Sequence, residues 1–511
     1  MQVDTQRARH SKDQLAPSVK QGDTPAVGRL VVVSNRLPIT FKKDGAHQWQ
    51  LQPSPGGLVT ALAPVLSHRR GLWIGWAGAP EHADISKQMA IASKGIGYTL
   101  RAVTLTEEEV DQYYHGFSNE ILWPLFHDLQ SLCNFDPAYW QSYQAVNRKF
   151  AQVVAGNVTK NDCVWVQDYH LFLAAKELRG MGKKSRLWFF LHTPFPSPDI
   201  FMKLPWRSQI LEGLLEYDLI GFQTWRDRNN FIHCVQALVP GLNVDTRMRV
   251  STIAMSGRNT KVGAFPISVN FREIARQAAD ETVERKASQI RKATGGHHVI
   301  LGVDRLDYSK GIPEKLHAFR NALERYPDLC GSASLIQLVS PGRPDIPEYQ
   351  RLKSEIERLV GEINGRFSQP GWIPVHYMSR TLKHSDLLAY YRAAGVALIT
   401  PLKDGMNLIA KEYCAANIDE SGVLILSEFA GAASQLRGHS LLVNPYDVEG
   451  VADAIHSACS MKTDERRRRM KMLRQAIAKR DIFRWANAFL RAANVDETSF
   501  LHPRSTKPVG G

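Results

Sequence analysis

The chain has 511 residues, with 64 Lys and Arg against 50 Asp and Glu, and a formal net charge of +14. Its 44% hydrophobic and 22% charged residues exclude collagen-like, mucin-like and wholly disordered proteins. The length predicts about two to four domains. No apolar run reaches the roughly 20 residues of a membrane helix, and the N-terminus lacks the apolar core of a secretory signal. We therefore expect a cytoplasmic protein without a membrane partner.

The basic excess is concentrated near the C-terminus, where residues 462–480 hold nine basic and two acidic side chains. Their helical composition predicts a solvated helix face, with an anionic surface partner as the alternative. The segment contains no aromatic residue, so we expect no nucleic-acid partner. The six cysteines form no CxxC pair, and we expect small buried side chains rather than disulfides or zinc ligands.

The ends of the chain differ from its interior. Residues 1–27 and 503–511 are polar and aperiodic, which predicts two disordered tails. Between them, short β-branched runs alternate with amphipathic stretches, as is typical of parallel α/β folds. The predicted strands are Leu30–Ser34, Val164–Val166, Leu187–Leu191, Leu219–Phe222, Val299–Val303, Ser334–Val339, Val396–Thr400, Val423–Ser427 and Leu441–Val443. The predicted helices are Leu58–Leu66, Ile210–Leu215, Pro313–Leu323, Tyr349–Ile363 and Val451–Ala458.

A domain boundary is expected near residues 268–280, where a strand is followed by the charged helical stretch Ala279–Ala293. We expect a first α/β domain over 28–275 and a second over 276–480. In such sheets, ligands bind beyond the carboxyl ends of the strands. Residues directly after strands are therefore the candidates for a site.

Six of the predicted strands are followed by polar side chains. These are Asn35 and Arg36; Asp168 and His170; His192; Asp304, Arg305, Asp307 and Lys310; Lys403, Asp404 and Asn407; and Glu428. Together they fit a site for a phosphorylated, hydroxyl-rich ligand. The glycines Gly56, Gly57 and Gly405 each precede a helix, where free backbone N–H groups favour phosphate.

Several other chemistries lack their motifs. The sequence contains no GxxxxGK[ST] loop and no GxGxxG after a strand, which weighs against P-loop enzymes and dinucleotide dehydrogenases. It has no HExxH for zinc and no GxSxG elbow for a serine nucleophile. We therefore expect no metal and no resident cofactor.

An ordered set of motifs from Gly28 to Ala493 resembles the trehalose-6-phosphate synthases, which are retaining glycosyltransferases. The motifs are VVVSNRLP (31–38), GGLVTAL (56–62), YHGFSNEILWPLFH (114–127), QDYH (167–170), FFLHTPFPSPDIF (189–201), GVDRLDYSKG (302–311), INGRF (363–367), TPLKDGMNLIAKEY (400–413) and LSEFAGAA (426–433). The resemblance implies an α/β fold of GT-B type, in which two Rossmann-like domains face each other across the active-site cleft. It also implies that a C-terminal helix within residues 481–502 crosses back to the first domain.

The implied reaction transfers glucose from UDP-glucose, or another nucleotide-glucose, to glucose 6-phosphate with retention of configuration. The nucleotide sugar is a co-substrate. The resemblance also leads us to expect a homo-oligomer and a separate trehalose-6-phosphate phosphatase that acts on the product. Two alternatives stay open: a glucosylglycerol-phosphate synthase that uses ADP-glucose and glycerol 3-phosphate, and a catalytically silent regulatory subunit.

The resemblance also assigns roles to individual residues. The acceptor phosphate would be held by Arg36, Tyr114, Trp123 and Arg343. The donor would be bound by Gly56, Gly57, Arg305, Lys310, Asp404, Gly405, Met406, Asn407, Leu408 and Glu412. The implied catalytic residues are Asp168, His192, Arg305, Lys310 and Asp404. The family has no clear carboxylate nucleophile, so front-face attack through an oxocarbenium-like ion pair is favoured over double displacement.

Four positions depart from the residues that are usual in the family: Gln167, Ser268, Pro344 and Lys403. Gln167 stands for His, Ser268 for Gly, and Lys403 for Arg. Pro344 follows Arg343 where Gly is usual. None of them removes a residue with an implied contact, so we expect an active enzyme.

Overall fold

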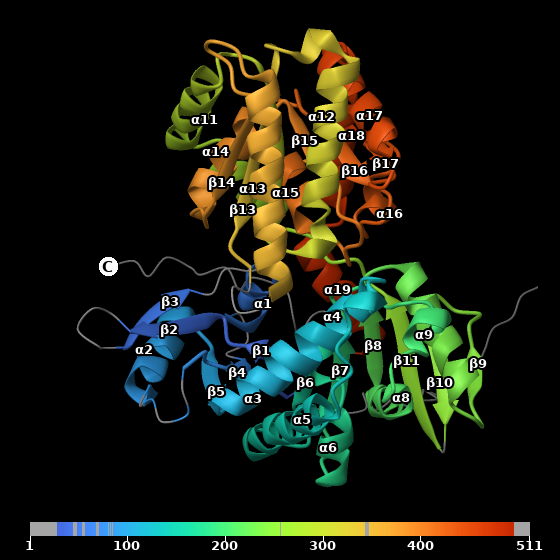
Figure 1. The fold of residues 1–511 in the computed structure, drawn as a ribbon. Coiled ribbons are helices and arrows are strands. Elements are labelled where there is room, and N and C mark those ends of the chain that lie inside the picture. The colour runs from blue at the N-terminus through green and yellow to red at the C-terminus, as the bar shows by residue number, and fades with distance from the viewer. Residues whose placement is uncertain are drawn as a thin grey trace, which may run out of the picture.

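The computed structural model describes residues 28–494 apart from 44–48, 54–56, 68–70, 80, 82, 84, 256 and 343–346. The tails predicted at 1–27 and 503–511 lie outside these described residues, as do 495–502. The described strands form a nine-stranded sheet, a six-stranded sheet and a two-stranded hairpin. Figure 1 shows the nine-stranded sheet in the blue to green half and the six-stranded sheet in the yellow to red half.

The first sheet has the strand order β5-β4-β1-β6-β7-β8-β11-β10-β9 and is parallel from β5 to β11. Side chains on both faces of its central strands are buried, which explains why these strands are continuous apolar runs. Their bounds are β1 Leu30–Arg36, β4 Leu72–Trp76, β5 Thr99–Val103, β6 Cys163–Gln167, β7 Arg186–Phe190, β8 Leu219–Phe222, β9 Asn243–Asp245, β10 Ser251–Met255 and β11 Arg258–Ala264.

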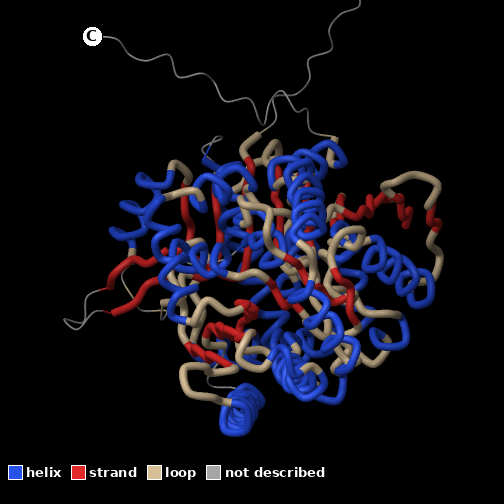
Figure 2. Tube along the Cα trace, turned by 90° about the horizontal axis from the view of Figure 1, so that it is seen from above, coloured by secondary structure: helices blue, strands red, loops and turns tan. Residues whose placement is uncertain are grey.

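Helices cover both faces of this sheet, and the β2–β3 hairpin extends from its side (Figure 2). The hairpin pairs β2 Ile39–Lys43 with β3 Trp49–Pro53. The helices are α1 Gly57–Ser67, α2 Ser86–Ile96, α3 Glu107–Glu109, the π-helix η1 Val110–Leu122, α4 Trp123–Phe126, α5 Pro137–Asn157, α6 Ala174–Gly180, α7 Pro198–Phe201, α8 Arg207–Leu215 and α9 Trp225–Leu238; the short turns are η2 Gln130–Leu132 and η3 Tyr169–Leu171.

The second sheet is wholly parallel, in the order β14-β13-β12-β15-β16-β17. Its strands are β12 His298–Arg305, β13 Ala333–Ser340, β14 Val375–Ser379, β15 Val396–Ile399, β16 Val423–Ser427 and β17 Leu441–Val443. Its helices are α10 Phe271–Ala278, α11 Glu281–Ala293, α12 Ile312–Arg325, α13 Pro347–Phe367, α14 His384–Ala393, α15 Leu408–Ala416, α16 Ala433–Leu436, α17 Val448–Ser460 and α18 Thr463–Lys479, with short turns η4 Tyr308–Lys310 and η5 Pro327–Leu329.

Both sheets follow the same winding rule. Numbered within its own sheet, each begins in the order 3-2-1-4-5-6, which is the order of a Rossmann fold. The predicted α/β class with two Rossmann-like domains is therefore confirmed. In each sheet the order reverses beside the first strand, and this switch point is where ligands of such folds bind.

The last described helix, α19 Ile482–Ala492, packs against the first sheet although it follows the second domain in the chain. Trp485 donates from Nε1 to the carbonyl oxygen of Phe265 at 3.0 Å. Phe489 stacks on Trp165 with ring centroids 4.4 Å apart. This is the return to the first domain that the resemblance implied for a helix within residues 481–502.

The basic segment at 462–480 is only partly the solvated face that the sequence predicted. Arg466 donates to the carbonyl oxygens of Ala458, Cys459 and Met461, which end the preceding helix α17. Arg474 donates to the last carbonyl groups of α15. These two cations therefore satisfy helix C-termini, a role that composition cannot reveal.

The described cysteines are all free thiols, and four of the six are buried, as predicted. Among the described residues, no helix is long and apolar enough to cross a membrane.

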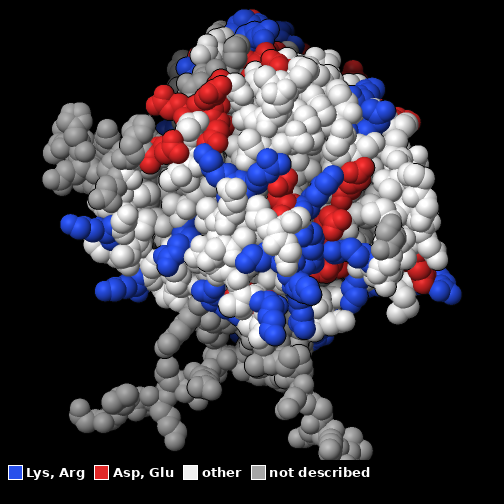
Figure 3. All heavy atoms as spheres, turned by 90° about the horizontal axis from the view of Figure 1, so that it is seen from below, with Lys and Arg blue, Asp and Glu red and all other residues white. Residues whose placement is uncertain are grey.

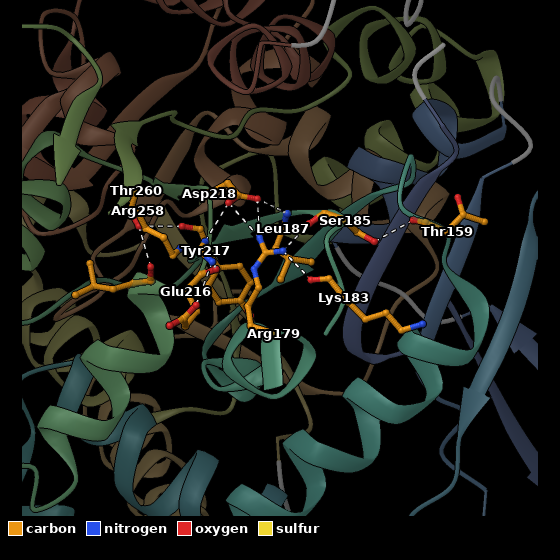
Figure 4. A network of polar contacts seen from close by, with 11 residues as sticks. Thr159, Arg179, Lys183, Ser185, Leu187, Glu216, Tyr217, Asp218, Arg258 and Thr260 are labelled. Carbon is orange, nitrogen blue, oxygen red and sulfur yellow. Dashed lines mark hydrogen bonds and ion pairs between the residues drawn. The ribbon is translucent and has the colours of Figure 1, made fainter. Parts of the chain in front are cut away.

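An open hollow of about 480 Å³ lies at the amino ends of β7 and β8, at the opposite edge of the sheet from the candidate residues. Figure 4 shows that Asp218 lies between Arg179 and Arg258 in this hollow. Arg258 also pairs with Glu216 at 3.1 Å. Figure 3 shows Lys and Arg gathered beside Asp and Glu on the face seen from below. Because Arg179 and Arg258 are both paired with carboxylates, we interpret this cluster of ion pairs as structural.

Candidate active site at the junction of the two domains

The candidate residues lie at the switch points of the two sheets. In the first sheet, Arg36 ends β1 and Asp168 follows the neighbouring strand β6. In the second, Arg305 ends β12 and Asp404 follows the neighbouring strand β15. Side-chain contacts between the two halves, described below, bring these two strand edges together.

Arg36 is exposed and lies between two aromatic rings. Its guanidinium carbon is 4.5 Å from the ring centroid of Trp76 and 5.3 Å from that of Tyr114. Such cation–π contacts orient a guanidinium while leaving its forked N–H groups available to an anion. Tyr114 lies on the π-helix and stacks on His170 at 6.0 Å. The structure thus brings together Arg36 and Tyr114, which the resemblance assigned to the same phosphate.

Trp123 belongs to the first domain but contacts the donor-side cations of the second. Its Nε1 donates to Oδ1 of Asp307 at 3.3 Å. Its ring lies 5.0 Å from the guanidinium of Arg305 and 5.9 Å from the ammonium group of Lys310. The sequence assigned Trp123 to the acceptor phosphate, and the structure places its indole against the expected donor cations.

Asp307 is fully buried and organises this corner. Its carboxylate accepts hydrogen bonds from the backbone N–H and the hydroxyl of Ser309, and from the indole of Trp123. Its other oxygen pairs with Arg305 at 2.7 Å. The sequence placed Asp307 after a strand but gave it no role. Its position two residues after Arg305 could have indicated that it pairs with this arginine.

Lys310 pairs with Asp404 across the switch point of the second sheet. The ammonium nitrogen lies 2.7 Å from Oδ2 of Asp404, and Asn407 donates to the same oxygen at 3.2 Å. Burial on its own would raise the pKa of Asp404, but Lys310 and Asn407 outweigh it and the pKa lies below its ordinary value. Asp404 is therefore an ionised acceptor held beside a cation.

His127 is a further residue of this corner that the sequence did not assign. Its buried ring packs on Trp123 at 4.1 Å, and its Nδ1 is 2.7 Å from the Trp123 carbonyl oxygen. Burial and the nearby charge of Lys310 lower the pKa of His127 to about 4. A neutral imidazole at this position adds no charge to the Lys310–Asp404 pair.

Asp168 and His192 lie together at the carboxyl ends of β6 and β7. The backbone N–H of His192 donates to Oδ1 of Asp168 at 3.2 Å. Burial raises the pKa of Asp168 to about 6, although the hydrogen bonds it accepts oppose the shift. Asp168 also has a φ of 70°, an uncommon backbone conformation that is found preferentially at functional sites.

Burial lowers the pKa of His192 to about 3, so its ring is neutral. Gln167 and Gln223 face its two ring nitrogens at 3.0 and 3.3 Å. Gln223 was missed by the sequence analysis, although it directly follows the predicted strand Leu219–Phe222.

Gly405 brings the two domains into direct contact. A Cβ at this position would lie 2.0 Å from the backbone oxygen of His192. A Cβ on Gly431 would lie 1.9 Å from the oxygen of Gly405. Only glycine allows the backbone to approach this closely at both positions.

Helix α15 presents the remaining donor candidates. Asn407, with a φ of 67°, caps the helix by accepting from the backbone N–H of Ala410 at 3.2 Å. Leu408 is its first residue, where backbone N–H groups have no intrahelical partner. The Met406 side chain is buried, so only its backbone can meet a ligand. Burial raises the pKa of Glu412 to about 7, although Tyr391 donates to it at 3.0 Å.

Three candidates need separate mention. Gly57 is the first residue of α1, as predicted for a glycine before a helix. Gly56 and Arg343 lie outside the described residues, as does Pro344.

Lys403, which replaces the family's usual Arg, forms an ion pair with Asp128 of the first domain. Gln167, which replaces His, accepts from the His192 ring. The buried hydroxyl of Ser268 has no hydrogen-bond partner among the described residues, and nothing in the structure explains this substitution. Among the described residues, no group of three or more His, Cys, Asp or Glu side chains could hold a metal ion.

Comparison with known proteins identifies relatives over nearly the whole chain. The chain is 43% identical over 468 residues to the trehalose-6-phosphate synthase of Mycolicibacterium vanbaalenii, covering 91% of this chain and 95% of the relative. It is 42% identical over 492 residues to that of Mycobacterium marinum, covering 94% and 97%.

Two of the similar solved structures contain bound ligands. One is a UDP-forming α,α-trehalose-phosphate synthase from Burkholderia xenovorans in complex with glucose-6-phosphate, with a TM-score of 0.82, 34% identity, and coverage of 91% of this chain and 100% of that one. The other is from E. coli and is bound with UDP-2-fluoro glucose, with a TM-score of 0.81, 38% identity, and coverage of 91% and 98%. Residues 28–495 match the model of glycosyltransferase family 20. The resemblance found in the sequence is thereby confirmed: the chain belongs to glycosyltransferase family 20.

Proposed function

We propose that this chain is a retaining glucosyltransferase that transfers glucose from UDP-glucose to glucose 6-phosphate and forms α,α-trehalose 6-phosphate. The observation that carries this proposal is the pair of facing cation sites. Arg36 lies in one domain between Trp76 and Tyr114. Arg305 and Lys310 lie in the other, against Trp123 of the first. Two separate cation sites suit two phosphorylated substrates.

On the acceptor side, Arg36 binds the phosphate of glucose 6-phosphate. A guanidinium offers forked donors that match phosphate oxygens, and the two flanking rings restrict its rotation. The hydroxyl of Tyr114 adds a hydrogen bond to the same group. The similar Burkholderia structure contains glucose-6-phosphate, which supports this choice over glycerol 3-phosphate. Arg343 is proposed from the resemblance alone.

On the donor side, Arg305 and Lys310 stabilise the negative charge that grows on the departing diphosphate. Charge stabilisation by preorganised groups is the main electrostatic requirement of this step. Asp404, which Lys310 holds ionised, accepts hydrogen bonds from the donor sugar. The free N–H groups at the start of α15 bind the diphosphate, and Glu412 accepts from the two hydroxyl groups of the ribose.

Retention follows from attack on the face that the diphosphate leaves. A double displacement needs a free carboxylate nucleophile. Asp307 is buried within four hydrogen bonds, Asp404 is held by Lys310, and Asp168 accepts the backbone N–H of His192. In the front-face route, the departing phosphate oxygen accepts the proton of the attacking hydroxyl. Arg305 and Lys310 supply cationic charge at this point, so we propose that the reaction needs no metal.

The product of this reaction retains a phosphate ester. A separate phosphatase must therefore remove it if free trehalose is to form, and we propose that this step belongs to another protein. We also propose that the chain works as a homo-oligomer without nucleic-acid partners. Size-exclusion chromatography with light scattering tests the oligomeric state.

Nucleoside diphosphate release tests the proposed function. UDP-, ADP- and GDP-glucose are each combined with glucose 6-phosphate or glycerol 3-phosphate, with and without a chelator. We expect the fastest release with UDP-glucose and glucose 6-phosphate, unchanged by the chelator. Release only with glycerol 3-phosphate would replace the acceptor assignment, and no release with any pair would contradict the proposed activity.

A further inference from the structure

The imidazole of His192 is held on both sides by amides of its own domain. Its Nε2 lies 3.0 Å from Oε1 of Gln167, and its Nδ1 lies 3.3 Å from Nε2 of Gln223. Gln167 ends β6, His192 follows β7 and Gln223 follows β8, so the three residues lie at the carboxyl ends of neighbouring strands of the first sheet. Both glutamines are at most 1% exposed, which leaves little room for water to replace either contact.

A backbone group at each end fixes the direction of these hydrogen bonds. The N–H of Ile267 can only donate, and it lies 2.9 Å from Oε1 of Gln223. The amide nitrogen of Gln223 therefore donates to Nδ1 of His192. At the other end, the carbonyl of Trp165 can only accept, and it lies 3.4 Å from Nε2 of Gln167. Oε1 of Gln167 therefore accepts from Nε2 of His192.

Both ends independently require the same imidazole, with its proton on Nε2 and a lone pair on Nδ1. We propose that Gln167 and Gln223 are positioning residues that keep His192 as this neutral tautomer, so that its ring is held in one orientation at the domain junction and carries no positive charge. A second proton would set an N–H of His192 against an N–H of Gln223. Burial also lowers the pKa of His192, which likewise favours the neutral ring.

This hydrogen-bonded chain continues into the second domain. The carbonyl of Ile267, in the segment that joins β11 to α10, accepts from the buried ammonium group of Lys411 on α15. At the other end of the arrangement, the carbonyl of His192 lies against Gly405, near the start of α15. The helix that carries the donor candidates is thereby linked to His192 at two points. A change of tautomer would loosen this link without removing a group that binds substrate.

Isotope-labelled histidine and NMR read the tautomer directly, and the His192 signals are assigned by their loss in His192→Asn. We expect the Nε2–H form in the unaltered protein. In Gln223→Glu, a carboxylate must accept from Nδ1, so we expect the Nδ1–H or doubly protonated ring. In Gln167→Glu, the carboxylate still accepts from Nε2, and we expect the original tautomer to persist. If the two glutamines had only a structural role, the two substitutions would have the same effect on the His192 tautomer.

The kinetic readout rests on the proposed glucosyl transfer. For Gln223→Glu we expect kcat to fall about tenfold or more with KM for both substrates within about twofold, because positioning of the reacting groups is lost. The exposed Gln152→Met is the matched control and should change neither kcat nor KM.

An Nδ1–H ring in the unaltered protein would overturn the proposal, and so would unchanged kcat in Gln223→Glu with a changed tautomer. If Gln223→Glu does not fold, the unaltered protein and Gln167→Glu still test the proposal: the Nε2–H form is expected in both, and an Nδ1–H ring in either overturns it. The NMR result stands apart from the reaction, so failure of the proposed function would not imitate either outcome.

Discussion

Gly405 of the second domain lies directly against the backbone carbonyl of His192 in the first. A methyl group added at Gly405 would stand 2.0 Å from that oxygen, and the neighbouring atom is backbone, which cannot rotate away. The two domains therefore meet through main-chain atoms at the point where the donor and acceptor residues converge. The geometry of the site therefore depends directly on how the two domains are positioned at this contact.

Gly405→Ala tests this requirement. We expect kcat/KM to fall by about 100-fold or more, because a displacement of about 1 Å at reacting groups has an effect of that order. Gly361→Ala in α13 is the control, since its added Cβ would meet no atom within 4 Å. Steady-state kinetics and thermal unfolding distinguish the outcomes. Full activity in Gly405→Ala would show that the domains need not meet at this point.

The Lys403–Asp128 ion pair is another contact between the domains. We expect Lys403→Met and Asp128→Asn each to lower kcat/KM a few-fold and to couple by about 0.2–1 kcal/mol in a double-mutant cycle, since the pair is partly exposed. High salt should weaken this coupling. Lys176 and Glu212, an exposed pair within the first domain, provide the control cycle. If the effects of Lys403→Met and Asp128→Asn on kcat/KM are strictly additive, the ion pair does not contribute to the contact between the domains.

Glu412 should make stability depend on pH. Burial raises its pKa in the folded chain from 4.5 to about 7. The folded state therefore favours the protonated carboxyl. Its contribution to the free energy of unfolding is fully present below about pH 4.5 and is lost as pH rises through about 7. Glu412→Gln should remove that loss, and denaturant unfolding at about pH 5 and pH 8 measures it.

Tyr391→Phe gives the opposite change at the same site. The Tyr391 hydroxyl lowers the pKa of Glu412 against the larger effect of burial, so its removal should extend the loss of stability to higher pH. Identical pH profiles for the unaltered chain and for both variants would contradict the shifted pKa.

A buried ion pair supports the donor corner from behind. The ammonium nitrogen of Lys315 in α12 and a carboxylate oxygen of Asp304 in β12 lie 2.5 Å apart, and both side chains are at most 2% exposed. Lys315→Met should destabilise the chain by about 3–5 kcal/mol, because it leaves a buried carboxylate without its partner. Adding Asp304→Asn should recover much of that loss while keeping an acceptor for Gln337. The exposed Lys353→Met should cost less than about 0.5 kcal/mol. Equal losses in Lys315→Met and in the double variant would refute this explanation.

The central parts of both sheets could be predicted from the sequence because their strands are buried on both faces and so form apolar runs. The strand Leu219–Phe222 has the predicted bounds, and Val423–Ser427 does too. The hairpin β2–β3 and the strands β5, β9, β10, β11 and β14 were not predicted, because their polar or exposed positions interrupt the apolar pattern. The prediction also missed β4, although that strand is apolar and buried throughout. The π-helix that carries Tyr114 was not predicted either, because no pattern of residue spacing in the sequence indicates a π-helix.

The site shows the same division. Residues that follow strands were found because parallel strands end at one edge of the sheet, and this rule placed Arg36, Arg305 and Asp404 correctly. Lys411 could not be found in this way. It resembles any helical lysine in sequence, yet its acceptors are a distant backbone carbonyl and an amide oxygen. Contacts with backbone groups far along the chain leave no trace in the identity of neighbouring residues.

The split between acceptor use and donor hydrolysis in two arginine variants tests the central claim most directly. That claim assigns Arg36 to the acceptor phosphate and Arg305 to the donor diphosphate. We expect Arg36→Ala to lose about 100-fold or more in glucosyl transfer to glucose 6-phosphate while slow hydrolysis of UDP-glucose stays within about twofold, because only the acceptor loses a charged hydrogen bond. Arg305→Ala should lower both activities together. Equal losses of transfer and hydrolysis in Arg36→Ala would contradict the assignment of two separate phosphate sites.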